Sequence, residues 1–346
     1  MNVRLRKLNE QIIVITGATS GIGLATARMA ARRGARLMLA ARGEDALRRL
    51  TKEIWDSGGE AAYVVADVGR EEDVNKIADA AVERFGGFDT WVNNAGTGIY
   101  GEVLEVPNED NRRLFDTNFW GVVYGSQAAA RHLKRRGGSI INVGSVVSDY
   151  TTPLQGMYCA TKHAVKSFTD ALRMELEVEG APVSVTLIKP SAIATPFAQH
   201  AGNYLDREPR LPPPRYSPDS VAEAILRCAE RQARDLYVGG AGKIMAASRY
   251  YAPRLTDKFM ERTMIRAQQT DRPATRREGG LYETSGDLNE RSDYDRMTFK
   301  SSLYAKTMMR PFMTGALLAG AGVAVAALAR RVLAGPPKRG LARLWR

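Results

Sequence analysis

The chain has 346 residues, 44% hydrophobic and 25% charged, which is enough for one core of about 200 to 250 residues and a further segment. Its net charge of +12 lies mainly at one end, because residues 300–346 carry nine Lys or Arg and no acidic residue, against 41 basic and 38 acidic residues elsewhere; no nucleic-acid partner is expected. The two cysteines, Cys159 and Cys228, lack the spacing of a disulfide framework or a metal site and are typical of a reducing compartment.

The body of the chain alternates between strand and helix patterns. Its charged N-terminus runs directly into the first strand, without the apolar stretch of a secretory signal, so we expect a cytoplasmic catalytic domain. Strands are predicted at 11–16, 36–41, 62–65, 90–92, 139–143, 183–188 and 236–238. Helical spacing starts at residue 22 and returns over 44–56, 71–85, about 111–135, the segment around 158–162, and 218–231. This alternation predicts an α/β doubly wound fold, a parallel seven-stranded sheet with helices on both faces.

A glycine-rich turn, Thr16 to Gly23, joins the first strand to the first helix. Its glycines permit a tight turn and close backbone approach, while the N–H groups and dipole of the helix N-terminus attract a pyrophosphate. The spacing Gly-x3-Gly-x-Gly differs from the common Gly-x-Gly-x2-Gly fingerprint, and a turn that binds nothing is the plainer alternative. Because a strand precedes it and a helix follows, we predict a dinucleotide site.

Arg42 follows the second strand, where an NAD-binding site usually places an acidic residue that accepts hydrogen bonds from the ribose hydroxyls. A guanidinium there suits a 2′-phosphate, which it can bind through two charge-assisted hydrogen bonds. The sequence therefore favours NADP(H) over NAD(H). A merely solvated Arg42, close to Glu44 and Asp45, is the alternative.

Tyr158 and Lys162 are four residues apart, so on a helix their side chains lie about 40° apart around the axis, on one face. An adjacent ammonium favours phenolate and is expected to lower the pKa of the tyrosine from about 10. The pattern alone also fits an exposed Tyr and Lys on a helix surface. Its meaning depends on its neighbours in the sequence.

From about Leu8 to Gly239 the chain resembles the short-chain dehydrogenase/reductase superfamily, in its single-domain branch. The turn Thr16 to Gly23 matches the TGxxxGxG motif, Asp67-Val68 matches the pair that holds the adenine, and Asn93 to Gly96 matches NNAG. The four catalytic positions of the superfamily are filled by Asn118, Ser145, Tyr158 and Lys162, with thirteen residues from the serine to the tyrosine. The motifs follow one another in the order and spacing of the superfamily.

The resemblance implies a Rossmann fold and hydride transfer between NADP(H) and a carbonyl or secondary alcohol. Tyr158 would be the general acid or base, and Lys162 would lower its pKa and bind the ribose hydroxyls. Ser145 would donate a hydrogen bond to the substrate oxygen, and Asn118 would hold a water in the proton path. The implied cofactor contacts are Gly17, Thr19, Ser20, Gly21, Ile22, Gly23, Arg42, Asp67, Val68, Asn94, Ala95, Gly96, Tyr158, Lys162, Pro190, Ile193 and Thr195. A homo-oligomer, dimer or tetramer, is also expected.

One motif departs from the superfamily pattern. After the sixth strand the superfamily often has Pro-Gly-x3-Thr, and this chain has Ser191 in place of the glycine, between Pro190 and Thr195. Serine tolerates positive φ less well than glycine, so we expect the local backbone to differ.

The substrate pocket is expected over the carboxyl ends of the strands, lined by 97–101, 147–155 and the segment after Thr195. That segment, 196–216, is rich in proline and predicts a loop with at most a short helix. The lining residues are mostly apolar or small, without a basic cluster, so the expected substrate is a hydrophobic ketone or alcohol of lipid, steroid or secondary-metabolite type.

Beyond Gly239 the resemblance fades. Residues 243–251 and 255–268 are predicted helices, which are expected either to extend the substrate side or to pack on a partner chain. We divide the chain into a catalytic domain 1–252, a helical extension 253–269, a flexible polar linker 270–305 and an apolar helix with basic flanks, 306–346. Within the last segment, 311–329 is uncharged and would form a helix about 28 Å long. It could span a membrane, lie on an anionic surface, or pack in an oligomer interface. A catalytically silent NADP(H)-binding scaffold or sensor, tethered to a membrane, is the alternative to an enzyme.

Overall fold

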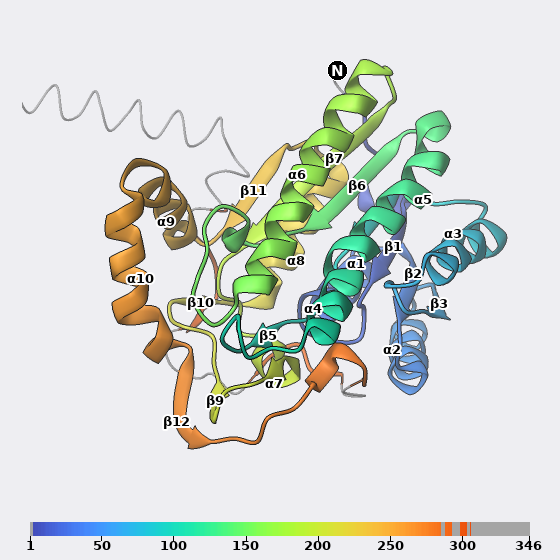
Figure 1. Ribbon diagram of the computed structural model, residues 1–346. Helices are drawn as coiled ribbons and strands as arrows, with labels where there is room; N and C mark the ends of the chain where they lie inside the picture. Colours follow the sequence, from blue (N-terminus) through green and yellow to red (C-terminus); the bar gives the residue numbers. More distant parts are fainter. Residues whose placement is uncertain (1–2, 285–287, 293–297, 303–304, 306–346) are drawn as a thin grey trace, which may run out of the picture. The chain divides into compact units, whose positions relative to one another are not determined.

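The computed structural model describes residues 3–284, 288–292, 298–302 and 305, and these belong to one compact unit, Met1–Ala305. A parallel sheet of seven strands runs through the unit in the order β11-β7-β6-β4-β1-β2-β3 (Figure 1). The strands are β1 Ile12–Thr16, β2 Arg36–Ala41, β3 Ala61–Val65, β4 Thr90–Asn93, β6 Gly138–Val143, β7 Val183–Pro190 and β11 Asp235–Val238. The predicted seven-stranded, doubly wound α/β fold is confirmed.

Helices cover both faces of this sheet (Figure 1). Helices α1 and α8 pack against each other on one face, while α3, α5 and α6 lie on the other. Their bounds, with that of α2, are α1 Gly21–Arg32, α2 Glu44–Asp56, α3 Glu71–Phe85, α5 Gly121–Arg136, α6 Gly156–Val178 and α8 Pro218–Glu230; a 3-10 turn, η1 Leu8–Glu10, precedes the first strand. The two helical layers bury the strands on both faces, so every residue of β1 and β7 is buried, including the polar Ser184, Thr186 and Lys189 of β7.

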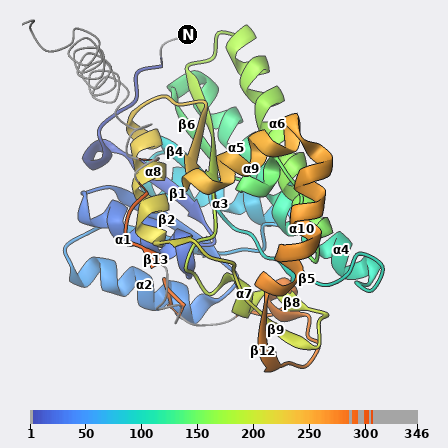
Figure 2. The ribbon, with the colours of Figure 1, turned by 90° about the vertical axis from the view of Figure 1, so that its left-hand side faces the viewer.

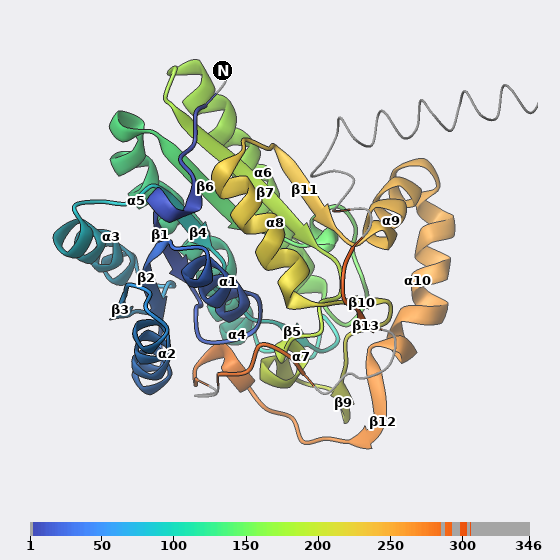
Figure 3. The same cartoon turned by 180° about the vertical axis from the view of Figure 1, so that it is seen from behind.

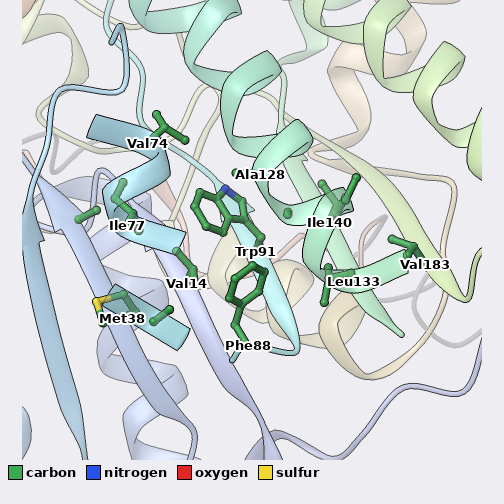
Figure 4. Packing of buried hydrophobic residues seen from close by; sticks show 14 of the residues in the cluster. Val14, Met38, Val74, Ile77, Phe88, Trp91, Ala128, Leu133, Ile140 and Val183 are labelled. Carbon is green, nitrogen blue, oxygen red and sulfur yellow. The ribbon is translucent and has the colours of Figure 1, made fainter. Parts of the chain in front are cut away.

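A large apolar cluster fills the space between the central strands and α3 and α5. Phe88 and Trp91 lie at its centre, with ring centroids 5.4 Å apart, and Figure 4 shows Val14, Ile77 and Ile140 among the residues around them. The Trp91 indole N–H donates to Asn93 Oδ1 at 2.7 Å, so its polar atom is satisfied inside the core. This rigid packing fixes the carboxyl ends of β1, β4 and β6, from which the site is built.

The helix predicted at about 111–135 is interrupted. It consists of α4 Asn108–Phe115, a π-helical turn Asp116–Trp120, and α5. Turns of this type widen the helix by one residue and often occur at functional sites. Here the turn contains Asn118, whose side chain is fully buried.

Between β6 and α8 the chain forms short elements above the carboxyl edge of the sheet. A 3-10 turn, η3 Val146–Ser148, follows Ser145, and the proline-rich segment 196–216 contains α7 Phe197–His200. Three short strand pairs hold these loops. They are β5 Ile99–Tyr100 with β8 Gly202–Asn203, β9 Arg207–Pro209 with β12 Gln269–Pro273, and β10 Arg215–Tyr216 with β13 Thr298–Phe299. The segment therefore has more structure than the expected loop with one short helix.

The chain beyond β11 continues as two helices, α9 Gly240–Tyr251 and α10 Pro253–Ala267, which lie side by side in Figure 2. Next come β12 Gln269–Pro273, η4 Gly279–Leu281 and β13 Thr298–Phe299. This stretch was expected to be a flexible polar linker over 270–305, but its described residues pack on the body, and Leu281 is fully buried beside Ile99 and Leu114. The polar composition of the stretch did not reveal this packing, because main-chain hydrogen bonds and ion pairs, rather than an apolar stripe, hold its described residues in place.

The uncharged run 311–329, for which three interpretations were open, lies outside the described residues. Within the part that the structure describes, no helix combines the length and the apolar character needed to cross a membrane.

Candidate active site

The glycine turn after β1 has the tight geometry that its sequence predicts. Gly17 has φ +65°, and a Cβ there would lie 2.8 Å from the Cα of Ala95. A Cβ on Gly23 would lie only 2.1 Å from the carbonyl oxygen of Gly17, so α1 packs directly against the turn. Asn94 braces the turn from behind, because its Nδ2 donates to the carbonyl oxygens of Thr16 and Gly17 at 3.0 and 3.2 Å.

The turn opens on two cavities that lie along one path. Gly17, Ser20, Ala95, Gly96, Thr97 and His200 line both of them. The smaller cavity, about 140 Å³, also contacts Thr19, Arg42, Asp67 and Val68 and corresponds to the predicted adenosine end. The larger one, about 430 Å³, reaches Ser145, Tyr158, Lys162, Pro190, Ile193 and Thr195. The predicted cofactor residues therefore follow one groove along the carboxyl edge of the sheet.

Ser145, Tyr158 and Lys162 meet at the floor of the larger cavity. Tyr158 and Lys162 lie on the first turns of α6, and the Ser145 hydroxyl is close enough to the Tyr158 hydroxyl to affect its pKa. The Ser145 hydroxyl also lies 3.5 Å from the carbonyl oxygen of Pro190 and accepts from the N–H of Val147. A hydroxyl pair of this kind can bind one substrate oxygen between them.

The pKa of Tyr158 is raised, not lowered as predicted. Burial disfavours its phenolate, and although the nearby Ser145 hydroxyl lowers the pKa, this effect is smaller. Lys162 does not reach the phenol: its ammonium donates to the carbonyl oxygen of Val143 at 3.0 Å and lies 5.8 Å from the Tyr158 ring centroid. Burial also lowers the pKa of Lys162, to about 8. The prediction counted only the charge pair and missed the desolvation of both groups.

Asn118 fixes a loop of the groove rather than reaching into the cavity. Its Oδ1 accepts from the N–H of Thr97 at 2.9 Å, and its Nδ2 donates to the carbonyl oxygen of Thr97 at 2.9 Å and to Thr161 Oγ1 at 3.3 Å. The side chain is thus fully occupied with protein partners. Its predicted role in holding a water stays a prediction.

Arg42 and Asp67, at the adenosine end, already have protein partners. The Asp67 carboxylate pairs with Arg113 and accepts from the N–H of Gly69. The Arg42 guanidinium donates, at 2.7 to 3.3 Å, to four backbone carbonyl oxygens, those of Gly280, Leu281, Tyr282 and Glu283. No sequence pattern predicted these partners, which come from a stretch some 240 residues later.

The backbone at Ser191 does not need a glycine. Among the described residues Leu154 is the one non-glycine with positive φ, so Ser191 adopts an ordinary conformation. Its Cβ is accommodated because residue 239 is a glycine with φ +110°, where an added Cβ would lie 2.6 Å from the Cβ of Ser191. Gly239 therefore leaves the space that the Ser191 side chain occupies.

The larger cavity is bounded by residues that the sequence predicted and by others that it missed. Thr97, Val147, Tyr150, Thr152 and Gln155 line it as predicted, whereas residues 98–101 do not. Another side comes from α9, α10 and the residue after α10, a region expected either to extend the substrate side or to pack on a partner chain. Its lining residues, which were not named from the sequence, are Ala241, Gly242, Met245, Phe259, Met260, Met264 and Gln268. The i, i+4 pair of Met260 and Met264 was the available signal for an apolar helix face.

The groove fits a dinucleotide in its chemistry. Glycines stand where a side chain would fill the turn, N–H groups of the α1 N-terminus face the groove, and a buried lysine and a tyrosine lie at its far end. No group of His, Cys, Asp and Glu side chains among the described residues could hold a metal ion. A parallel sheet with this turn and this Tyr and Lys pair defines a nicotinamide-dependent oxidoreductase.

The chain belongs to the short-chain dehydrogenase family, whose profile matches residues 11–204. It is 48% identical over 322 residues to the uncharacterized oxidoreductase YxnA of Bacillus subtilis, covering 92% of this chain and 90% of that protein. It is 37% identical over 235 residues to 11-beta-hydroxysteroid dehydrogenase A of Sesamum indicum, covering 65% and 67% respectively. The match to YxnA thus includes most of the chain beyond Gly239.

The fold is also similar to a solved structure of the same family. A short chain dehydrogenase/reductase from Burkholderia phymatum in complex with NAD has a TM-score of 0.64 and 27% identity, covering 78% of this chain and all of the other. These matches confirm the predicted superfamily and a nicotinamide cofactor, without distinguishing NADP(H) from NAD(H).

Proposed function

We propose that the protein is an NADP(H)-dependent oxidoreductase that interconverts a carbonyl and a secondary alcohol on a hydrophobic substrate. The observation that carries the proposal is the position of Tyr158 and Ser145 at the floor of an apolar cavity of about 430 Å³, at the end of a groove that begins at the glycine turn. Such a cavity combines a large apolar surface with a few polar groups that fix one oxygen.

Three polar residues of the cavity, Ser145, Tyr158 and Lys162, have roles in this reaction. The bound nicotinamide would supply or accept the hydride. The Tyr158 hydroxyl, kept protonated by burial, would donate its proton to the carbonyl oxygen or take one from the alcohol in the reverse direction. Ser145 would donate a hydrogen bond to the same oxygen, where negative charge develops. Burial lowers the pKa of Lys162 to about 8, and a hydroxyl or negative partner, such as the cofactor ribose, would help its ammonium to hold the proton.

The substrate side supports a hydrophobic ligand. Three methionines from α9 and α10, Met245, Met260 and Met264, face the cavity together with Phe259 and Leu211. Methionine side chains are flexible and polarizable, and they adapt to apolar ligands of different shape. The relative from Sesamum indicum is named as a hydroxysteroid dehydrogenase, which is in keeping with a steroid-like or lipid-like substrate. The homo-oligomer and the membrane contact stay predictions.

A panel of hydrophobic ketones and alcohols, scored by NADPH absorbance, tests the proposal. We expect turnover of at least one compound by the wild type and none by Tyr158→Phe. A protein that binds NADPH but turns over none of the panel would instead favour the catalytically silent scaffold.

The proposed preference for NADP(H) depends on Arg42. This residue lines the adenosine cavity at the position after β2, where NAD-binding sites usually have an acidic residue. Its four carbonyl partners carry no net charge, and the nearby Asp67 carboxylate is paired with Arg113, so the Arg42 guanidinium can still attract a 2′-phosphate. Titration of Arg42→Leu with both cofactors tests the assignment: we expect at least tenfold weaker NADPH binding, on the order of 1 to 3 kcal/mol, and little change for NADH. Equal weakening for both cofactors would show that Arg42 only anchors the chain beyond α10.

A further inference from the structure

A part of the C-terminal extension lies along the cofactor groove. We call residues 278–284 and 288–292 the C-terminal strap. Its first residues include η4, which lies between α2 and α4 (Figures 1 and 3). The adenosine cavity takes part of its wall from the strap, because Gly280, Glu283 and Thr284 line it together with Ala46 and Val68.

The strap runs along the groove from the adenosine end to the nicotinamide end, as a bound dinucleotide would. It contacts Arg42 at the adenosine end, then Asn289 accepts a hydrogen bond from the N–H of Gly21 at 2.9 Å, and finally the N–H of Ser292 donates to the carbonyl oxygen of Ala194 at 3.3 Å. Gly21 stands at the N-terminus of α1, where a pyrophosphate is expected, and Ala194 precedes Thr195 at the nicotinamide end. A cofactor that reaches both cavities must pass Gly21, and the strap already contacts this residue.

Several contacts hold the strap outside the groove itself. Leu281 is fully buried, and its carbonyl oxygen also accepts from Arg113 at 3.0 Å. The Tyr282 hydroxyl donates to Asp110 at 2.8 Å. Glu290 forms an ion pair with Arg28 of α1 at 2.9 Å. The strap is therefore attached on both sides of the groove, to α4 and to α1.

We propose that the C-terminal strap is the outer wall of the dinucleotide site and closes over the bound cofactor, which can leave only when the strap opens. On binding, a phosphate oxygen takes over the N–H of Gly21 from Asn289, while the contacts at Arg113, Asp110 and Arg28 keep the strap in place. The inference rests on the proposed function only for the identity of the dinucleotide, and it concerns cofactor release rather than turnover.

A disulfide across the groove edge tests the proposal. A Cβ placed on Gly43 would lie 3.7 Å from the Cβ of Thr284, within the span of about 3.5 to 4.5 Å that disulfides require. In Gly43→Cys/Thr284→Cys, oxidised after loading with NADPH, we expect release into excess unlabelled NADP⁺ to be at least about tenfold slower than in the same protein after reduction. NADPH fluorescence follows the release, and the native Cys159 and Cys228 are buried. NADH is run in parallel.

Two results would overturn the proposal. Equal release rates in the oxidised and reduced protein would show that the strap does not cover the cofactor. Failure of the oxidised protein to retain NADPH, although the reduced protein binds it, would show that the strap occupies the cofactor's own place. A wild-type protein that binds neither NADPH nor NADH would overturn the proposed function as well, which separates the two failures.

A milder pair of variants tests the same point without a cross-link. Glu290→Gln removes the ion pair between the strap and α1, and we expect release about two to five times faster, as for the loss of a partly exposed ion pair. The matched control is Glu179→Gln, which removes the pair of Glu179 with Lys134 at 2.6 Å, away from the groove. Release that is unchanged in Glu290→Gln, or equally changed in both variants, would count against the strap.

Discussion

The sheet body and the C-terminal extension are stabilised by different interactions. Body strands such as β1 and β7 are wholly buried, and the core around Trp91 fixes the carboxyl ends where the site lies. The strap instead contacts the body through backbone carbonyls, one buried leucine and charged side chains. The comparison shows that a polar, aperiodic segment can be part of the same compact unit when its main chain finds partners.

The largest expected effect lies in the body. Tyr158→Phe removes the hydroxyl that would exchange a proton with the substrate, so we expect kcat/KM to fall by about a hundred- to ten-thousandfold. Cofactor affinity should change by less than about threefold, because the strap and the glycine turn are untouched. Steady-state kinetics and NADPH titration measure both quantities. Substantial residual turnover would show that another group supplies the proton.

Leu281→Ala tests whether the extension and the body unfold together. The side chain is fully buried beside Ile99 and Leu114, so we expect a loss of about 2 to 5 kcal/mol in the free energy of unfolding. The matched control is Leu104→Ala, since Leu104 is 95% exposed and should change stability by less than about 0.5 kcal/mol. Urea denaturation followed by tryptophan fluorescence gives both values. Equal stabilities in the two variants would mean that the strap contributes nothing to the unit.

The pH dependence of stability reports on the buried Lys162. Its pKa in the folded protein is about 8, below the ordinary value of 10.5, so between these values the unfolded chain binds a proton that the folded protein does not. The free energy of unfolding from this group therefore rises with pH across that interval. Relative to Lys162→Met, we expect the wild type to gain about 1 to 3 kcal/mol from pH 8 to 10.5.

Denaturation of both proteins at several pH values measures this difference. Subtracting the variant cancels the other groups that titrate in the same range, such as Cys159, whose pKa burial raises to about 11. Lys52→Met, at an exposed lysine, is the control and should show no such trend. A pH-independent difference between wild type and Lys162→Met would mean that the ammonium is already compensated in the folded protein.

The smallest expected effect is on substrate binding by the extension. Met264→Ala shortens a side chain of α10 that lines the larger cavity, and we expect KM for a bulky hydrophobic substrate to rise by about three- to thirtyfold. Cofactor affinity should stay the same. Met174→Ala, at an exposed position on α6, is the control. If both variants leave KM unchanged, the extension does not contact the substrate.

The body could be predicted because its signals are local. The change from strand to helix spacing across Gly17, and the four-residue step from Tyr158 to Lys162, depend on residues close in the sequence. The fold, the family and the meeting of Ser145 with Tyr158 all follow from such patterns. The same reasoning failed for the pKa of Tyr158, because desolvation depends on what the whole fold places around the ring.

The extension could not be predicted in the same way. The carbonyl partners of Arg42 are backbone atoms, which every residue possesses, so no side-chain pattern marks them. The sequence predicted α9 and α10 as helices but left open whether they extend the substrate side or pack on a partner chain, because helical spacing does not say what an apolar face contacts. The space for the Ser191 side chain likewise depends on Gly239, a residue 48 positions later in the sequence.

The contact of Arg42 with Leu281 joins positions 239 residues apart. During synthesis the glycine turn and the first strands leave the ribosome long before residue 281, so this contact forms late even if the strands pair early. A nascent chain therefore presents its groove without the strap. The newly made protein can meet its first cofactor molecule with an open groove, whereas every later exchange takes place in the finished protein.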